Sequence, residues 1–123
     1  GRETARAMLE GGGGTLLFTG ASASLRGRAE LTAFAAAKAG LRMVSQSMAR
    51  ELGPRGLHVA HVIIDGLIDG DRARDVMSEA VAAKGDDELL DPDAIAETFW
   101  QLHAQPRCAW TQELDLRPYR EPF

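Results

Sequence analysis

The chain has 123 residues, of which 45% are apolar, and its 14 basic and 18 acidic side chains leave a formal charge of −4. This length allows one domain with a substantial core, and the lack of a basic stripe argues against a nucleic-acid partner. No apolar run reaches the length of a bilayer span and no signal peptide is visible, so we expect no membrane partner. The single cysteine, Cys108, cannot form an internal disulfide, which suits the reducing cytosol and predicts a cytoplasmic protein.

The chain begins with a predicted helix over residues 2–10, and Gly1 is not an initiator methionine, so we expect a piece of a longer protein. Four glycines at residues 11–14 follow this helix and precede the apolar run at residues 15–19. Phosphate-binding loops follow a strand and open a helix. The opposite order here favours a flexible turn, and the apolar run predicts a strand that is buried on both faces.

A long helix is predicted from Leu31 to Leu52, after a loop at residues 20–28 that is rich in Gly, Ala and Ser. Apolar residues recur in this helix at spacings of three and four and form one stripe. Gly53 and Pro54 are a stop signal for the helix. Residues 57–64 are rich in Val and Ile and predict a second buried strand. The strand, helix and strand form a βαβ unit, whose crossover should be right-handed.

The second half of the chain predicts two further helices and a last strand. Asp71 can cap a helix that ends near Lys84, and residues 85–90 read as a polar loop. Asp91 is a capping carboxylate before a proline, which predicts a helix that reaches about residue 104. Residues 110–116 predict the last strand. The expected fold class is therefore α/β, with three parallel strands and helices on the faces of the sheet.

The order of these elements, together with several short motifs, resembles the C-terminal half of a short-chain dehydrogenase/reductase. Residues 14–20 look like the fifth strand of that family, residues 23–27 like the loop behind it, and residues 34–41 like the active-site helix. Residues 49–59 resemble the helix exit and the sixth strand. Residues 65–68 stand where the family usually has Pro-Gly-x-Val or Pro-Gly-x-Ile. The order and spacing of the matches carry the resemblance, which covers nearly the whole chain.

This resemblance implies that residues 1–123 are the C-terminal part of a single doubly wound Rossmann-type domain. The N-terminal dinucleotide-binding half, with its glycine-rich fingerprint, would then lie outside this chain. It also implies NAD or NADP as the cofactor of the full-length protein and a small molecule as the substrate. As in much of the family, a homo-oligomer would form through the helix from Leu31 to Leu52.

The segment from Phe34 to Lys38 resembles the Tyr-x-x-x-Lys motif of the family, with phenylalanine in the tyrosine position. Residues four apart share one helix face. In the family the lysine lowers the pKa of the phenol, which exchanges a proton with the substrate, and it also binds the nicotinamide ribose. The family serine, about thirteen residues before the tyrosine, corresponds to Ala21. Ser22, one position away, is the candidate substitute.

Other candidate binding residues follow the two predicted strands. Ligands in open α/β sheets bind beyond the carboxyl ends of the strands. Gly20, Asp65 and Gly66 are therefore expected at the cleft, and the resemblance adds Ile68 to Lys38 as a cofactor-binding residue.

No metal site is predicted. His58 and His61 lie at odd spacing on one strand, so they point to opposite faces and are more simply surface or sheet-packing residues. His103 and Cys108 lack the paired spacing of a zinc site. The aromatic residues of the C-terminal third are expected to cover the sheet, with the lining of a substrate pocket as the alternative. These residues are Phe99, Trp100 and Trp110.

Three functions remain open at this point. The first is an NAD(P)-dependent oxidoreductase that transfers a hydride between alcohol and carbonyl through a degenerate Ser-Tyr-Lys site, with Ala21 and Phe34 at two of its positions. The second is a non-catalytic relative that binds cofactor or forms oligomers. The third is an inactive fragment. Phe34→Tyr in the full-length protein discriminates between the first two.

Overall fold

Strand β2 (Leu57–Ile64) is buried along its whole length and forms the centre of a three-stranded sheet. The computed structural model describes residues 1–122. Strand β1 (Gly14–Ala21) pairs with one edge of β2 and strand β3 (Glu113–Leu116) with the other, both in parallel. The α/β fold with three parallel strands is as predicted, and the order β1-β2-β3 explains why β2 carries the longest run of buried residues.

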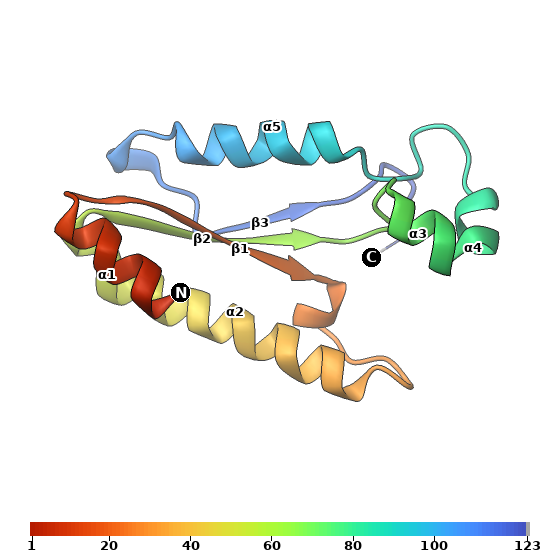
Figure 1. Cartoon of the computed structure of the whole chain (residues 1–123), viewed down its shortest axis with the longest axis horizontal. Coiled ribbons are helices and arrows are strands. Elements are labelled where there is room, and N and C mark those ends of the chain that lie inside the picture. The colour runs from red at the N-terminus through yellow and green to blue at the C-terminus, as the bar shows by residue number, and fades with distance from the viewer. Residues whose placement is uncertain (123) are drawn as a thin grey trace.

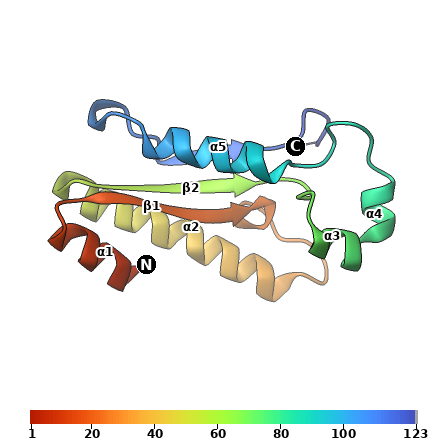
Figure 2. The same cartoon turned by 45° about the horizontal axis from the view of Figure 1, so that its top comes forward.

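Helices cover both faces of the sheet (Figures 1 and 2). Helices α1 (Arg2–Glu10) and α2 (Thr32–Leu52) lie on one face, and α5 (Pro92–His103) lies on the other. Because successive side chains of a strand point to opposite faces, β2 contributes to two separate cores. Leu57 and Val59 pack with residues of α1 and α2, whereas Val62 and Ile64 pack against the α5 side.

All three strands end at the same edge of the sheet. Ala21 pairs with Ile64, and Ile64 pairs with Leu116, so the loops that follow the strands start side by side. The 3₁₀ turn η1 (Ser22–Ser24) and the short helices α3 (Asp71–Val76) and α4 (Ser78–Ala82) also lie toward this end of the molecule (Figure 1). Parallel pairing therefore brings together segments that are far apart in the sequence.

The first half of the chain follows the predicted elements closely. The bounds of the first helix and of β2 are as predicted, and the long helix begins one residue later, at Thr32. Strand β1 continues two residues beyond the predicted end, to Ala21, because its pairing with β2 runs to Ile64. Its apolar residues are only half-buried, which corrects the expectation of burial on both faces, since β1 is an edge strand of the described sheet.

The predicted helix over residues 71–84 is instead two short helices. Met77 leaves the helical region at φ −131° and ψ 35°, and Gly70 stands at the N-cap position that was expected for Asp71. Neither helix has a buried residue, and helices of this length need tertiary packing to stay continuous. The loop that follows also differs from a purely polar segment, because Leu90 is buried and forms a β-bridge with Ile68.

Strand β3 starts at Glu113, three residues later than predicted. The side chain of Gln105 accepts a hydrogen bond from the backbone N–H of Thr111 at 2.7 Å and donates to the Thr111 hydroxyl at 2.8 Å, which holds this segment away from strand pairing. Trp110 stacks on His58 with ring centroids 4.8 Å apart.

The aromatic residues of α5 divide between the core and the surface. Phe99 packs against the α5 side of the core as expected. Trp100 is 63% exposed and contacts the ring of His103, so it does not cover the sheet. Within residues 1–122, none of the helices combines the length and the apolar character that crossing a bilayer requires.

Candidate functional site

A cavity of about 600 Å³ opens at the carboxyl ends of β1 and β2. It is bounded by the turn after β1, the first turns of α2 and the loop after β2. Five residues that the sequence singles out line it, and they are Ala21, Ser22, Phe34, Asp65 and Gly66. The position agrees with the rule that open α/β sheets bind ligands at this edge.

Phe34 and Lys38 lie on the same face of α2, and Phe34 lines this cavity. The Phe34 ring is 46% exposed, and the Lys38 Nζ lies 5.7 Å from its centroid. The same Nζ donates a hydrogen bond to the carbonyl oxygen of Thr19 at 2.9 Å. This bond holds the ammonium against the end of β1 and uses one of its three N–H donors. The Lys38 ammonium thus lies beside an aromatic ring that has no hydroxyl.

The turn after β1 presents one hydroxyl to the cavity. Ala21 lines the cavity with a methyl group, and its backbone N–H donates to the Ser24 Oγ at 3.1 Å. Ser22, the first residue of η1, is partly exposed and is the hydroxyl-bearing residue among those that line this cavity. Ser22 therefore offers a side-chain hydroxyl to this cavity.

Asp65 follows β2 and joins three segments through its buried carboxylate. Its Oδ2 lies 3.2 Å from Arg117 Nη2 and 3.9 Å from Arg26 Nη2, and its backbone N–H donates to the carbonyl of Leu116. Only 6% of the side chain is exposed. These contacts occupy the carboxylate with two guanidinium groups, so the structure supplies a packing and charge-pairing role for Asp65.

Gly66 and Ile68 continue the same loop. Gly66 has a φ of +150°, and a Cβ on it would lie 2.8 Å from the Cδ of Pro118, so this position requires glycine. Ile68 is 39% exposed and lines a second hollow with Phe34 and Gly66, next to the first. The structure thus brings these predicted residues together around Phe34.

Gly20 is buried near the end of β1 and is not among the residues that line the cavity. A Cβ at this position would stand 2.3 Å from His61 Nε2 and 3.0 Å from Ser24 Oγ. The absence of a side chain therefore makes room for a buried imidazole and a buried hydroxyl. This steric role explains the glycine without a ligand.

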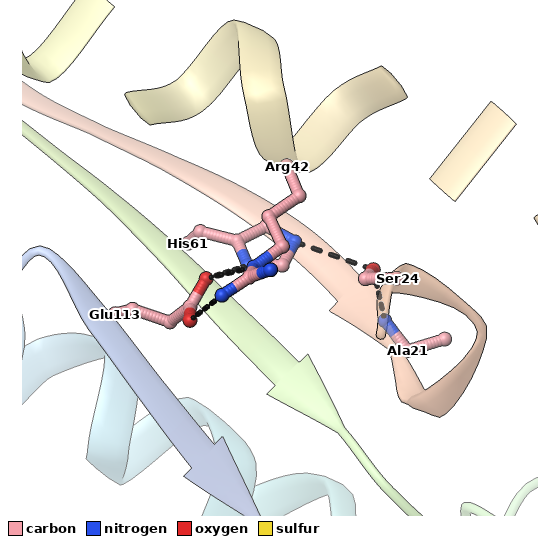
Figure 3. Close-up of polar contacts among 5 residues, drawn as sticks. All are labelled: Ala21, Ser24, Arg42, His61 and Glu113. Carbon is pink, nitrogen blue, oxygen red and sulfur yellow. Dashed lines mark hydrogen bonds and ion pairs between the residues drawn. The ribbon is translucent and has the colours of Figure 1, made fainter. Parts of the chain in front are cut away.

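Four polar side chains form a hydrogen-bonded chain with two buried members and two half-buried ones, and we call them the polar chain (Figure 3). The Arg42 guanidinium donates to both carboxylate oxygens of Glu113, each at 2.8 Å. Glu113 Oε2 lies 3.0 Å from His61 Nδ1, and His61 Nε2 lies 3.5 Å from Ser24 Oγ. His61 is fully buried and Ser24 is 5% exposed.

Sequence reasoning did not find the polar chain, because its members come from four separate elements. His61 was expected as a surface or sheet-packing residue and is instead a hydrogen-bonded member of this chain. Two signals were present in the sequence. His61 interrupts a run of Val, Ile and Ala in β2, and Glu113 opens the last strand, where it pairs directly with His61.

The charge of Glu113 is stabilised in this position. The hydrogen bond from the Arg42 guanidinium holds the pKa of the Glu113 carboxyl below the ordinary value of 4.5. The hydrogen bond from His61 acts in the same direction, and partial burial opposes both. The polar chain is therefore anchored by an ionised carboxylate.

His58 points to the opposite face from His61, as predicted, and it is buried. Its Nε2 lies 2.9 Å from the carbonyl oxygen of Thr111, and its ring stacks on Trp110. Across residues 1–122 no three His, Cys, Asp or Glu side chains are grouped in a way that could hold a metal ion. Cys108 is exposed.

The family model of the short chain dehydrogenases matches residues 2–84, and the chain belongs to this family. A solved short-chain dehydrogenase from Rhodopseudomonas palustris is 47% identical to it, with a TM-score of 0.73. That match covers 96% of this chain and 44% of the solved chain. A search of curated proteins finds no significant match.

Two more distant structures share the fold. A serine dehydrogenase complexed with NADP⁺ is 19% identical, with a TM-score of 0.83 and a match over 99% of this chain and 51% of that one. A 7α-hydroxysteroid dehydrogenase complexed with NADH and 7-oxo glycochenodeoxycholic acid is 23% identical, with a TM-score of 0.77 and coverage of 96% and 48%. The chain thus spans about half the length of these solved structures.

Gly20→Ala is expected to destabilise the protein by about 1–3 kcal/mol, because the new methyl group would force His61 and Ser24 to move in a packed interior. Gly40→Ala is the matched control. Gly40 lies in α2 with open space around a Cβ, so alanine there should stabilise by up to about 1 kcal/mol. Denaturant unfolding of the three proteins measures both effects, and equal stability of the Gly20→Ala variant and the parent would contradict the described contact.

The lowered pKa of Glu113 predicts that its pairing stabilises the fold above pH 4.5 and that this contribution is lost as the pH falls through the lower folded-state value. The parent should therefore lose more stability in this acid range than Glu113→Gln, which cannot titrate. Arg42→Met should behave like Glu113→Gln, because it removes the largest cause of the shift. Unfolding free energies from pH 6 to pH 2 give the comparison, and parallel pH profiles for parent and variants would refute it.

Proposed function

We propose that the protein that contains this chain is an NAD(P)-dependent oxidoreductase of alcohol and carbonyl groups with a degenerate Ser-Tyr-Lys site. The observation that carries the proposal is Lys38, held beside an aromatic residue of α2 at the edge of a cavity in a short-chain dehydrogenase fold. In this proposal the chain is the C-terminal part of a Rossmann-type domain, which agrees with its coverage of about half of each solved relative.

Several features of this chain fit a nicotinamide cofactor, NAD or NADP. The Lys38 ammonium can offer N–H donors to ribose hydroxyls, since its bond to Thr19 uses only one of them. Gly66 and Ile68 supply a loop that passes beside Phe34 at the cavity. A bound nicotinamide would supply the hydride chemistry. Structures of relatives with NADP⁺ and NADH support the same assignment.

The proton chemistry of this proposed site differs from the family pattern. Phe34 cannot exchange a proton, and Ala21 cannot donate a hydrogen bond through its side chain. Loss of a general acid removes about 10²- to 10⁴-fold in rate. Among the residues that line the cavity, Ser22 carries the hydroxyl that could donate a hydrogen bond to a substrate oxygen. The same two substitutions favour a second candidate function, a non-catalytic relative that binds the cofactor.

Phe34→Tyr in the intact protein is expected to raise nicotinamide-dependent turnover of alcohols by about tenfold or more, because it restores a phenol within reach of the Lys38 charge. The double variant Phe34→Tyr with Lys38→Met is the matched control and should show no gain, since no ammonium would lower the phenol pKa. Turnover is followed by nicotinamide absorbance over a panel of alcohols and carbonyl compounds.

Three results separate the candidate functions. A gain that needs Lys38 supports the degenerate oxidoreductase site. Tight cofactor binding without turnover in either form supports the binding protein. Fast turnover of the parent with no gain from Phe34→Tyr contradicts the degeneracy.

We further propose that the intact protein forms a homo-oligomer through α2. Met43 and Val44 are 50% and 49% exposed on this helix, and Leu31 and Phe34 add apolar surface toward its start. Several large apolar side chains exposed on one helix make this helix a candidate interaction surface. The proposal also follows the resemblance of this helix to the family's association surface.

Met43→Glu is expected to shift the intact protein toward a smaller assembly, because a buried unpaired carboxylate would oppose association. Trp100→Glu is the matched control, since Trp100 is 63% exposed and lies on α5, which covers the opposite face of the sheet from α2 (Figure 1). Sedimentation velocity measures both. An unchanged mass for Met43→Glu, or an equal shift for both variants, would refute an interface on α2.

A further inference from the structure

The polar chain ends directly beneath the cavity wall. It begins on α2 at Arg42, crosses β3 and β2 through Glu113 and His61, and reaches the turn after β1 at Ser24 (Figure 3). Ser24 Oγ accepts the N–H of Ala21 at 3.1 Å. Ala21 is the residue that precedes Ser22, and both line the cavity. The remaining members of the chain stand behind this wall.

The hydrogen bonds of the polar chain run in one consistent direction. A carboxylate only accepts, so His61 Nδ1 carries the proton that is donated to Glu113. In the neutral imidazole Nε2 is then an acceptor, and the Ser24 O–H is the donor toward it. This orientation leaves a lone pair of Ser24 Oγ for the Ala21 N–H. The rotamer of Ser24 is therefore set by groups on other elements.

The bond from Ala21 to Ser24 closes the turn that contains Ser22. It spans three residues and joins the last residue of β1 to the end of η1. With this bond in place, the backbone around Ser22 is held at both sides, and its side chain lies at the cavity. The Ser22 carbonyl also accepts hydrogen bonds from the N–H groups of Leu25 and Arg26, so loss of the Ala21–Ser24 bond would loosen only the start of the turn, without removing any group from the cavity.

A buried polar chain is a poor source of stability compared with apolar side chains of the same size. His61 is nevertheless fully buried beneath Gly20, whose missing side chain makes room for it. What such a chain supplies is a single defined geometry, because each donor has one acceptor. That geometry ends at the turn that carries the cavity hydroxyl.

We propose that Arg42, Glu113, His61 and Ser24 are positioning residues that hold Ser22 in place to bind the substrate oxygen. The role of Ser22 in this inference rests on the oxidoreductase function proposed above. The four residues do not touch the cavity, and they act through the turn between Ala21 and Ser24.

The first test uses a readout that is independent of activity. In the intact protein, Ser24→Ala should speed amide hydrogen exchange of Ala21 by about tenfold, which corresponds to one lost hydrogen bond. Exchange at Leu17, in the middle of β1, should stay unchanged. Ser24→Thr keeps the hydroxyl and should restore slow exchange. If Ser24→Ala does not fold, Arg42→Met at the other end of the chain takes its place, with a weaker effect in the same direction. Unchanged exchange at Ala21 overturns the inference.

The second test asks whether Ser24 acts through Ser22. Ser24→Ala should lower kcat by about tenfold to hundredfold, as misplacement of a binding group does, with an unchanged Kd for the nicotinamide cofactor. In a Ser22→Ala background the same substitution should cost nothing more, because coupled residues are not additive. If the reductions in kcat from Ser24→Ala and Ser22→Ala instead multiply in the double variant, Ser24 does not act through Ser22. Faster Ala21 exchange in a protein without any turnover would overturn the oxidoreductase function while the positioning of Ser22 stands.

Discussion

The rest of the structure depends on the burial of β2 between two layers of helices. Every residue of this strand is buried, and its side chains alternate between a hydrophobic core on one face of the sheet and a second core on the other. A strand in that position needs parallel neighbours on both edges and helices on both sides, because an uncovered face would expose Val and Ile to water. The long helix α2 and the crossover that it makes follow from this requirement.

The parallel pairing of the strands also creates the cavity. The ends of β1, β2 and β3 meet at one edge, so residues that are far apart in the sequence come to line one cavity. The same register sets His61 opposite Glu113. Both lie next to α2, where the Arg42 guanidinium pairs with the Glu113 carboxylate. The cavity and the polar chain thus meet at the end of β1, where Ala21 lines the cavity and donates its backbone N–H to Ser24.

Local patterns predicted those elements whose character is decided by their own residues. Gly53 and Pro54 end the long helix, and Asp91 caps α5 through its side chain. The prediction of a single helix over residues 71–84 was wrong, because these residues have no buried face that would keep one continuous helix together. The predicted start of β3 was also wrong, because the side chain of Gln105 binds the backbone N–H of Thr111 and keeps that residue out of the strand pairing. The lack of tertiary packing sets the first of these boundaries, and a side chain six residues away sets the second.

The sequence by itself determined the α/β class and the resemblance to the family, since periodicity, stop signals and the four-residue spacing from Phe34 to Lys38 are local properties. Only the tertiary structure decided the surroundings of these residues. It placed Ser22 at a cavity, paired the Asp65 carboxylate with two guanidinium groups and assembled the polar chain from four elements. The physical reason is that strand register and helix packing choose the partners of a side chain, and a linear pattern does not encode which distant residue arrives beside it.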